Sequence, residues 1–388
     1  MTFLAQALKG LQHGLPFFVG MTKTSALTPA AFTDDLGIYL VIPYLAHIFG
    51  LKITSAINLF FSLIIYLSLI PAIIGTFYLF KHIWIKVLIS VILIFASHYV
   101  LHGHAGVSGV YLVNYPIIIA IVPLFLYFIN NHKNKFISMT LFLLLSGVMI
   151  GFWQYLRSFS SIPVLIFMCF ILIFAHKPKW IMKIIFLITL FIGISMTILA
   201  FHSMINHRDS YLKQHVPNYK PVITGHPLWH PVYLGFGFIK NNPYHITFSD
   251  TCAANKVYSI DKNASNLGKE YNDILKKEVF KIIRKNPYFF VKTIYQKTLS
   301  VLGSKGIFHH QAIYLLAILL CMILCPMRWY IEVAFWLALL FSALPGIAVI
   351  PTVAYIFSFS TFIFLYALLS LGFLIDNYDK IQLPFAKK

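Results

Sequence analysis

Eleven side chains in this sequence carry a carboxylate that could act as a base, so each can be considered in turn. We set aside those of the C-terminal tail, Glu332 near a span end, and the acids of 261–278, which alternate with lysines. Asp34, Asp35, Asp209 and Asp250 remain. The pair Asp34-Asp35 directly precedes an apolar segment, where a carboxylate can act as a general base on an acceptor hydroxyl. The other interpretation is a helix N-cap, since carboxylates are favoured beside the free amides of a helix start.

Basic and aromatic side chains gather in the polar breaks on one side of the apolar runs. Imidazole and guanidinium groups complement phosphate oxygens, and aromatic rings stack on the apolar faces of sugars. A phosphorylated or sugar-bearing ligand is therefore expected; the alternatives are an ordered loop packed on the membrane and, for the arginine, an anchor at a span end. The candidate substrate-binding residues are His102, His104, Arg157, His207, Arg208, His226, Trp229, His230 and Tyr233.

Metal and nucleic-acid ligands receive little support from the sequence. The spacings of His102 with His104 and of His226 with His230 permit a divalent metal, but such short patterns are weak signals. The four cysteines are scattered and form no zinc or disulfide pattern. The formal charge of +19 is typical of loops beside anionic lipid, so no nucleic-acid partner is expected.

The elements that must position these residues are membrane-spanning helices. Hydrophobic residues make up 59% of the sequence and charged residues 11%, and the apolar runs have the length of a helix that crosses a bilayer. We predict an all-α, polytopic transmembrane bundle of about nine spans. These are 57–80, 84–101, 113–130, 136–156, 162–175, 181–201, 308–325, 329–345 and 350–375.

The charges of the breaks alternate along the chain. The breaks 81–86, 131–135, 176–183 and 326–328 are basic, as is the C-terminal tail. The intervening short breaks contain no Lys or Arg except Arg157; they are 102–112, 157–161 and 346–349. The positive-inside rule therefore predicts that the basic breaks are cytoplasmic and that the candidate residues lie on the exofacial side.

The chain is predicted to have four parts. Residues 1–56 form an exofacial N-terminal segment, in which 37–50 is an interfacial or re-entrant helix; 57–201 form six spans; and 308–388 form three spans and a cytoplasmic tail. Between them, 202–307 form an exofacial loop with 15 Lys and Arg against six Asp and Glu. In this loop Leu275, Val279, Ile282 and Ile283 share one face of an amphipathic helix that is expected to lie on the membrane and to break at Pro287.

An acidic pair in the first exofacial segment (FTDDLGIYLVIPYLAHIFG), many spans, one large exofacial loop and a juxtamembrane helix with an Asn-Pro break (FKIIRKNPYFFVKTIY) resemble the GT-C glycosyltransferases. The resemblance covers the architecture of most of the chain, and its motifs are limited to Asp34-Asp35 and, loosely, GHPLWHPVYLGFG. It implies that Asp34 or Asp35 is the catalytic carboxylate and that basic exofacial residues hold a lipid phosphate. Such enzymes carry a transmembrane helix before the acidic loop, so an upstream helix is expected to be missing from this chain.

The expected function is transfer of a sugar from a polyprenyl-phosphate donor to an exofacial hydroxyl or amine of a glycan, lipid or protein acceptor. The expected location is a bacterial inner membrane, with membrane lipids around the chain and the active site facing the periplasm. A transporter or lipid flippase is the first alternative, although it needs ionisable residues near mid-span. An O-antigen polymerase or ligase is a further alternative, because it shares the lipid donor and the basic exofacial loop.

Overall fold

The computed structural model describes residues 2–30, 35–103, 109–130, 136–175, 179–221, 228–264, 268–303, 305–306 and 309–377. Fifteen α-helices lie in these ranges, with two short 3-10 helices and two antiparallel pairs of short strands. The helices are α1 (Thr2–Gln12), α2 (Leu36–Ile48), α3 (Ile53–Leu79), α4 (Ile83–Gly103), α5 (Asn114–Asn130), α6 (Phe136–Leu156), α7 (Ile162–Phe174), α8 (Trp180–His215), α9 (Trp229–Leu234), α10 (Asp250–Tyr258), α11 (Lys269–Lys285), α12 (Pro287–Gly303), α13 (Gln311–Leu324), α14 (Trp329–Ala348) and α15 (Phe357–Asp376). The 3-10 helices are η1 (Gly109–Val113) and η2 (Gly235–Phe238), and the strands are β1 (Val19–Met21), β2 (Leu27–Pro29), β3 (Lys305–Gly306) and β4 (His309–His310).

Seven helices in the described ranges are long and apolar enough to cross a membrane, namely α3, α4, α5 with the preceding 3-10 turn, α6, α8, α14 and α15. The chain is therefore a polytopic helical membrane protein, as the sequence predicts. The two other predicted spans, 162–175 and 308–325, form helices of only 13 and 14 residues. At about 1.5 Å per residue each is roughly 20 Å long, which is shorter than a hydrocarbon core of about 30 Å.

Contacts between neighbouring helices give the directions of the two short helices. Gly147 contacts Gly193, and four residues further along both helices Gly151 contacts Thr197, so α6 and α8 are parallel. Helix α7 connects them and must run in the opposite direction. Gln311 contacts Ser360 and Tyr314 contacts Phe364, so α13 and α15 are parallel in the same way, and α14 returns between them.

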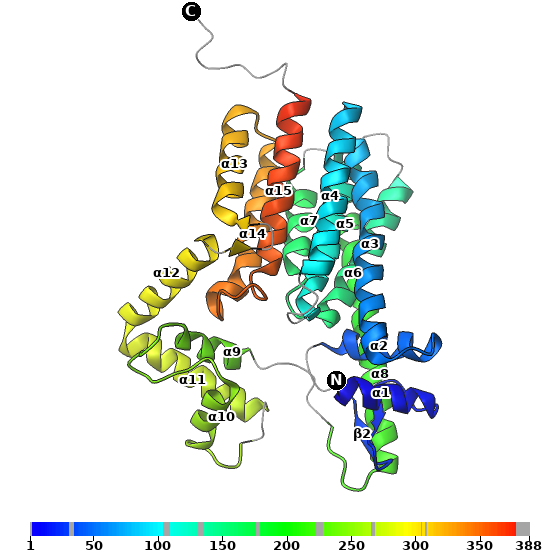
Figure 1. The fold of residues 1–388 in the computed structure, drawn as a ribbon, viewed down its shortest axis with the longest axis vertical. Helices are drawn as coiled ribbons and strands as arrows, with labels where there is room; N and C mark the ends of the chain where they lie inside the picture. Colours follow the sequence, from blue (N-terminus) through cyan, green and yellow to red (C-terminus); the bar gives the residue numbers. More distant parts are fainter. Residues whose placement is uncertain are drawn as a thin grey trace, which may run out of the picture.

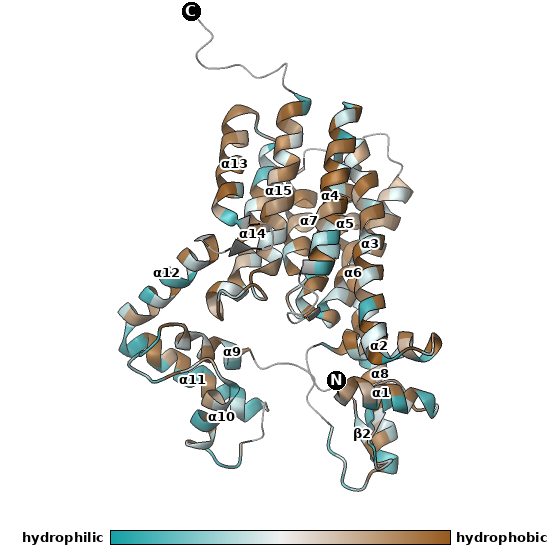
Figure 2. Cartoon of the chain, in the orientation of Figure 1, coloured by the Kyte–Doolittle hydropathy of each residue, from teal (hydrophilic) through white to brown (hydrophobic). Residues whose placement is uncertain are grey.

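The non-spanning parts lie at one end of the bundle (Figure 1). Helices α1 and α2 lie across that end beneath α3, and α9–α12 occupy the opposite side of the same end. At the other end, the carboxylate of Asp376 accepts hydrogen bonds from the backbone N–H groups of Lys81 and His82, at 2.9 Å each. The brown, apolar colour of the bundle gives way to more hydrophilic residues on α9–α11 and α1 (Figure 2).

Helix α8 continues well beyond its predicted end at residue 201. Its 36 residues span roughly 54 Å, so its last turns project out of the bundle. The N-terminal segment packs on this projection, where Phe18, Leu36 and Phe201 form a buried cluster with Met204 and Ile205 against them. The run 202–209 is therefore helical, and the predicted boundary between span and loop falls inside α8.

Helices α9 to α12 enclose a small apolar core of their own. The predicted stripe of α11 is present, and its buried members are Tyr271, Leu275, Val279 and Ile282. This stripe contacts α9 and α10 rather than lipid, which corrects the expectation that it lies on the membrane. The predicted break is present as well, because Asn286 accepts a hydrogen bond from the N–H of Phe289 at 3.0 Å and α12 begins at Pro287.

Helices α6 and α8 approach so closely that only glycine fits at their contact. A Cβ atom at Gly193 would collide with the carbonyl oxygen of Leu144 and would lie 2.8 Å from the nitrogen of Val148. A Cβ atom at Gly151 would lie 2.9 Å from the Cβ atom of Thr197. Small residues four apart are a common basis for helix association in membranes, where burial of apolar surface provides little driving force.

We expect the Gly193→Leu substitution to destabilise the protein by about 1–3 kcal/mol, because the new side chain must separate α6 from α8. Thermal unfolding in detergent measures the effect as a lowered melting temperature. Gly303→Leu is the matched control, since a Cβ atom at Gly303 meets no other atom within 4 Å. Equal melting temperatures for the two variants would contradict the proposed packing role.

Candidate functional site

The acidic segment and Arg157 meet at the end of the bundle that carries α1 and α2. The Nη1 atom of Arg157 donates hydrogen bonds to both carboxylate oxygens of Asp35, at 3.2 Å each. Its Nη2 atom donates to the hydroxyl of Tyr111 at 2.8 Å, and the guanidinium lies 4.5 Å from the centre of the Tyr111 ring. The Arg157 and Asp35 side chains are 19% and 17% exposed, so the ion pair is partly shielded from water.

The end of α6 and the start of α2 position this ion pair. Arg157 follows the last residue of α6 and continues its hydrogen bonding, with its N–H donating to the carbonyl of Trp153 at 3.0 Å. Gly37 in the first turn of α2 allows the close approach, because a Cβ atom there would lie 3.1 Å from the backbone nitrogen of Leu156. Asp35 occupies the N-cap position of α2 without a capping hydrogen bond from its side chain. Its carboxylate therefore contacts Arg157 instead of acting as a conventional cap.

Two tyrosines complete this cluster, and the sequence alone does not single them out. Tyr111 lies in η1, and its ring contacts the ring of Tyr355 edge-on at 5.5 Å. Tyr355 belongs to the connection between α14 and α15, so three separate breaks in the bundle meet here. Tyr111 lies in a predicted break without Lys or Arg, whereas Tyr355 lies within the predicted span 350–375, so no pattern in the sequence brings the two together.

A cavity of about 380 Å³ lies between α6, α7 and α8 beside the ion pair. Its apolar lining includes Ile150, Ile194 and Ile198. Leu36 and Ser158, the neighbours of Asp35 and Arg157 in the chain, also line it. The remaining polar lining residues are Gln154, Tyr155, Ser161 and His202. A lipid chain could lie along the apolar wall with a polar head group near Arg157.

Neither His207 nor Arg208, the two candidate residues in the projecting part of α8, lines this cavity. The Arg208 side chain is fully buried, and its Nε atom donates to Asp209 at 2.8 Å. The hydroxyl of Tyr219 donates to the same oxygen of Asp209, also at 2.8 Å. His207 is exposed. Asp209 is thus engaged by neighbours on and after α8.

Another candidate histidine lies near the end of α4. His102 is exposed, and its ring packs 4.3 Å from that of His98. Asp34, His104 and His226, which the sequence analysis also selects, lie outside the described residues.

Trp229, His230 and Tyr233 belong to a second cluster, in the unit formed by α9–α12. His230 is buried, with Nδ1 2.9 Å from the Tyr271 hydroxyl and Nε2 3.1 Å from the Asp250 carboxylate. Burial, with the nearby charges of Tyr258 and Asp250, raises the pKa of Tyr271 to about 12. The protonated hydroxyl can therefore donate to Nδ1, which leaves the Nε2 hydrogen to donate to Asp250.

The remaining contacts of this second cluster are also made within its unit. The Trp229 ring packs on Phe280 at 5.4 Å, and the Lys276 ammonium lies 5.9 Å from the Trp229 ring. Tyr233 is part of the apolar core, and burial raises the pKa of its hydroxyl above the usual value. The two clusters lie on opposite sides of the same end of the bundle (Figure 1).

No family model, no curated protein and no solved structure matches this chain.

A buried lysine lies between the two clusters. The Lys297 ammonium on α12 donates to the carbonyl of Ala348 at 3.3 Å, and the lysine is 2% exposed. A Cβ atom at Gly235 would lie 2.6 Å from this carbonyl oxygen and 2.8 Å from the ammonium, so glycine is required there. The connection that follows Ala348 reaches Tyr355. The segment from Ala348 to Tyr355 thus links the two clusters. Ala348 contacts Lys297 of the α9–α12 unit, and Tyr355 contacts Tyr111 of the other cluster.

Within the described ranges, no group of three His, Cys, Asp or Glu side chains could hold a metal ion. The two histidine spacings that permit a metal each include one residue outside these ranges. The chemistry that the described cluster can supply is a carboxylate, a guanidinium and two phenol groups, next to residues that line an apolar cavity.

Proposed function

We propose that this protein is a glycosyltransferase that moves a sugar from a polyprenyl-phosphate donor to an acceptor hydroxyl or amine. The observation that carries this proposal is the Asp35–Arg157 ion pair, whose chain neighbours Leu36 and Ser158 line the α6–α8 cavity. Few reactions need a carboxylate base and a phosphate-binding cation beside a site for a long apolar chain. The GT-C resemblance of the acidic segment supports the same assignment.

In the proposed reaction the acceptor oxygen or nitrogen attacks the anomeric carbon of the sugar. The bond from this carbon to the phosphate oxygen breaks, and the acceptor proton passes to the carboxylate of Asp35 or of Asp34. The electron pair leaves with the polyprenyl phosphate, whose charge Arg157 neutralises. Binding of the donor phosphate would draw Arg157 from Asp35 while Tyr111 keeps the guanidinium in place, and the carboxylate would then be free to accept the proton.

A transporter or lipid flippase is less well supported. Ion pathways and proton relays place ionisable residues near the middle of spans. In the described spans, Asp, Glu, Lys and Arg occur only near the ends or in the projecting part of α8. Glu332, for example, lies in the first turn of α14 and accepts a hydrogen bond from Tyr366. An O-antigen polymerase or ligase would use the same lipid donor and stays a further alternative.

Labelling with a photoreactive donor analogue tests this function. A polyprenyl phosphate that carries a benzophenone in its chain is expected to crosslink to the cavity wall near Ile194 and Ile198. Unlabelled polyprenyl phosphate should compete, whereas the alcohol without the phosphate should not. The Arg157→Gln variant should lose most of the labelling, and equal competition by the alcohol would remove the support for a phosphate donor.

The proposal also places the site on the exofacial side, facing the periplasm if the membrane is a bacterial inner membrane. The test uses Lys262→Cys and Lys179→Cys, each in a variant without the four natural cysteines. An impermeant maleimide added to intact cells is expected to label position 262 and to reach position 179 only after permeabilisation. If both positions react from the same side, the orientation is wrong.

A further inference from the structure

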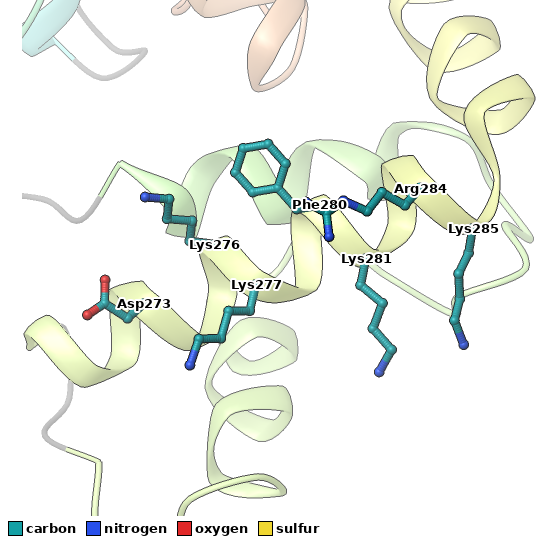
Figure 3. A pocket seen from close by; sticks show the side chains of 7 residues that line it. All are labelled: Asp273, Lys276, Lys277, Phe280, Lys281, Arg284 and Lys285. Atoms are coloured by element: carbon teal, nitrogen blue, oxygen red, sulfur yellow. The ribbon is translucent and has the colours of Figure 1, made fainter.

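Helix α11 presents its cations outward in two rows. Lys277, Lys281 and Lys285 form one row, and Lys276, Phe280 and Arg284 form the other (Figure 3). Residues four apart lie above one another on a helix, so the rows run side by side along its axis. Together with Asp273 they line an open groove of about 670 Å³.

Most of these cations lack an acidic partner. Glu278 is shared by Lys256 at 3.0 Å and Lys281 at 3.3 Å. In the described part of the chain, no such ion pair forms at Lys276, Lys277, Arg284 or Lys285. Five cations against Asp273 give the groove a strong positive charge that its own residues do not balance.

An aromatic pair, Phe280 and Trp229, lies beside these cations. Phe280 is 41% exposed, and its ring packs on Trp229 at 5.4 Å. The Lys276 ammonium lies over the Trp229 ring, 5.9 Å from its centre. Cations beside an exposed aromatic face suit a ligand that carries both negative charge and the apolar faces of sugar rings.

The spacing of the cations indicates an extended ligand. From Lys276 to Lys285 the helix advances about 14 Å, which is longer than a single phosphate or carboxylate group. An anionic membrane surface is less suitable, because an interfacial helix inserts its apolar face into the lipid. The apolar face of α11 is buried against α9 and α10.

We propose that the outer face of α11, together with Trp229, binds an extended anionic polysaccharide. Its acidic groups contact the two rows of cations, and a sugar ring lies on Phe280. The identification of this polysaccharide as the acceptor rests on the proposed transfer reaction. The proposed binding of the polysaccharide to α11 does not depend on that reaction. The sugar acceptor would then be held at the same end of the bundle as Asp35 and Arg157.

Fluorescence anisotropy with labelled dextran sulfate tests this binding directly, with the full chain in nanodiscs of neutral phosphatidylcholine. A variant with Lys277→Gln, Lys281→Gln, Arg284→Gln and Lys285→Gln is expected to bind at least about tenfold more weakly, because exposed ion contacts each contribute modestly. Salt should weaken binding to the parent protein. The Phe280→Ala variant should lose about threefold, and neutral dextran should not bind.

The matched control changes the same number of charges on other exposed lysines, with Lys213→Gln, Lys220→Gln, Lys240→Gln and Lys262→Gln. It should bind dextran sulfate as the parent does. Equal losses in the two variants would overturn the site, because binding would then follow total charge. A third outcome would assign the outer face of α11 to the membrane instead. In that outcome the parent protein binds phosphatidylglycerol vesicles but not dextran sulfate, and the α11 variant loses the vesicle binding. Because neither readout requires sugar transfer, an inactive enzyme would not alter the result.

Discussion

The Asp35→Asn variant is expected to transfer sugar about two to four orders of magnitude more slowly than the parent, because asparagine cannot accept the acceptor's proton. The substitution keeps the size of the side chain and removes its charge. Arg157 would then lack the carboxylate that it contacts at 3.2 Å, so donor binding should be retained or strengthened. A loss in kcat without a rise in the donor KM is the signature of this role. The measurement is the initial rate with a polyprenyl-phosphate sugar in detergent.

Asp34 requires the same substitution, since the sequence favours either member of the pair as the base. The member that serves as the base should show the larger loss in kcat. Asp250→Asn is the matched control, because this carboxylate is 92% exposed and contacts His230 in the other cluster. If both Asn variants of the pair keep the parental rate while the Asp250 variant is inactive, the site lies in the α9–α12 unit. If all three variants remain active, the transfer reaction should be abandoned in favour of transport.

The bundle could be predicted from the sequence because hydrocarbon and water separate residues so strongly. Seven of the nine predicted runs form helices of spanning length. Helix ends are harder to predict, because hydropathy does not define them. Residues 202–215 are polar on average, yet they continue α8, since Phe201, Met204 and Ile205 pack against the N-terminal segment. Tertiary contacts outweigh hydropathy at this end.

Amphipathic patterns identify a buried face but not what covers it. The stripe through Leu275, Val279 and Ile282 was predicted correctly as an apolar face. Its partner was not, because lipid and protein favour the same periodicity. Here α9 and α10 cover the stripe, so the cations on the opposite face are directed away from the small core and remain available to a ligand.

The candidate site shows the same limit. Charge alternation assigns Asp35 and Arg157 to one side of the membrane, but 122 residues separate them, and only the packing of α2 on α6 brings them into contact. Tyr111 and Tyr355 could not be chosen from 22 tyrosines without that packing. The candidate substrate-binding residues also do not form one group, because Trp229 and His230 contact α10 and α11 in a separate unit.

Lys297 provides a second prediction, which concerns stability and its dependence on pH. Burial removes water from the ammonium and lowers the pKa of Lys297 to about 7, whereas an unfolded lysine titrates at about 10.4. Between these two values the unfolded chain binds more protons than the folded chain, so this residue makes folding more favourable as pH rises. Below about pH 7 the folded state bears the full cost of a buried charge, which is on the order of 5 kcal/mol for such a shift.

The Lys297→Met variant keeps the length of the side chain and removes its charge. We expect it to be more stable than the parent at pH 6. We expect this difference to shrink as pH rises from about 7 to 10, because the folded lysine is then neutral and the free-energy cost of deprotonating it on folding falls as pH approaches the unfolded pKa of about 10.4. Differential scanning fluorimetry of the two proteins across this range gives the difference in melting temperature at each pH. Lys292→Met on the same helix is the control, because Lys292 is exposed and its replacement should give a small difference that does not change with pH. A Lys297→Met difference that stays constant from pH 6 to 10 would show that Lys297 remains charged in the folded protein. The carbonyl of Ala348, at the start of the segment that leads to Tyr355, would then bind an ammonium ion rather than an amine.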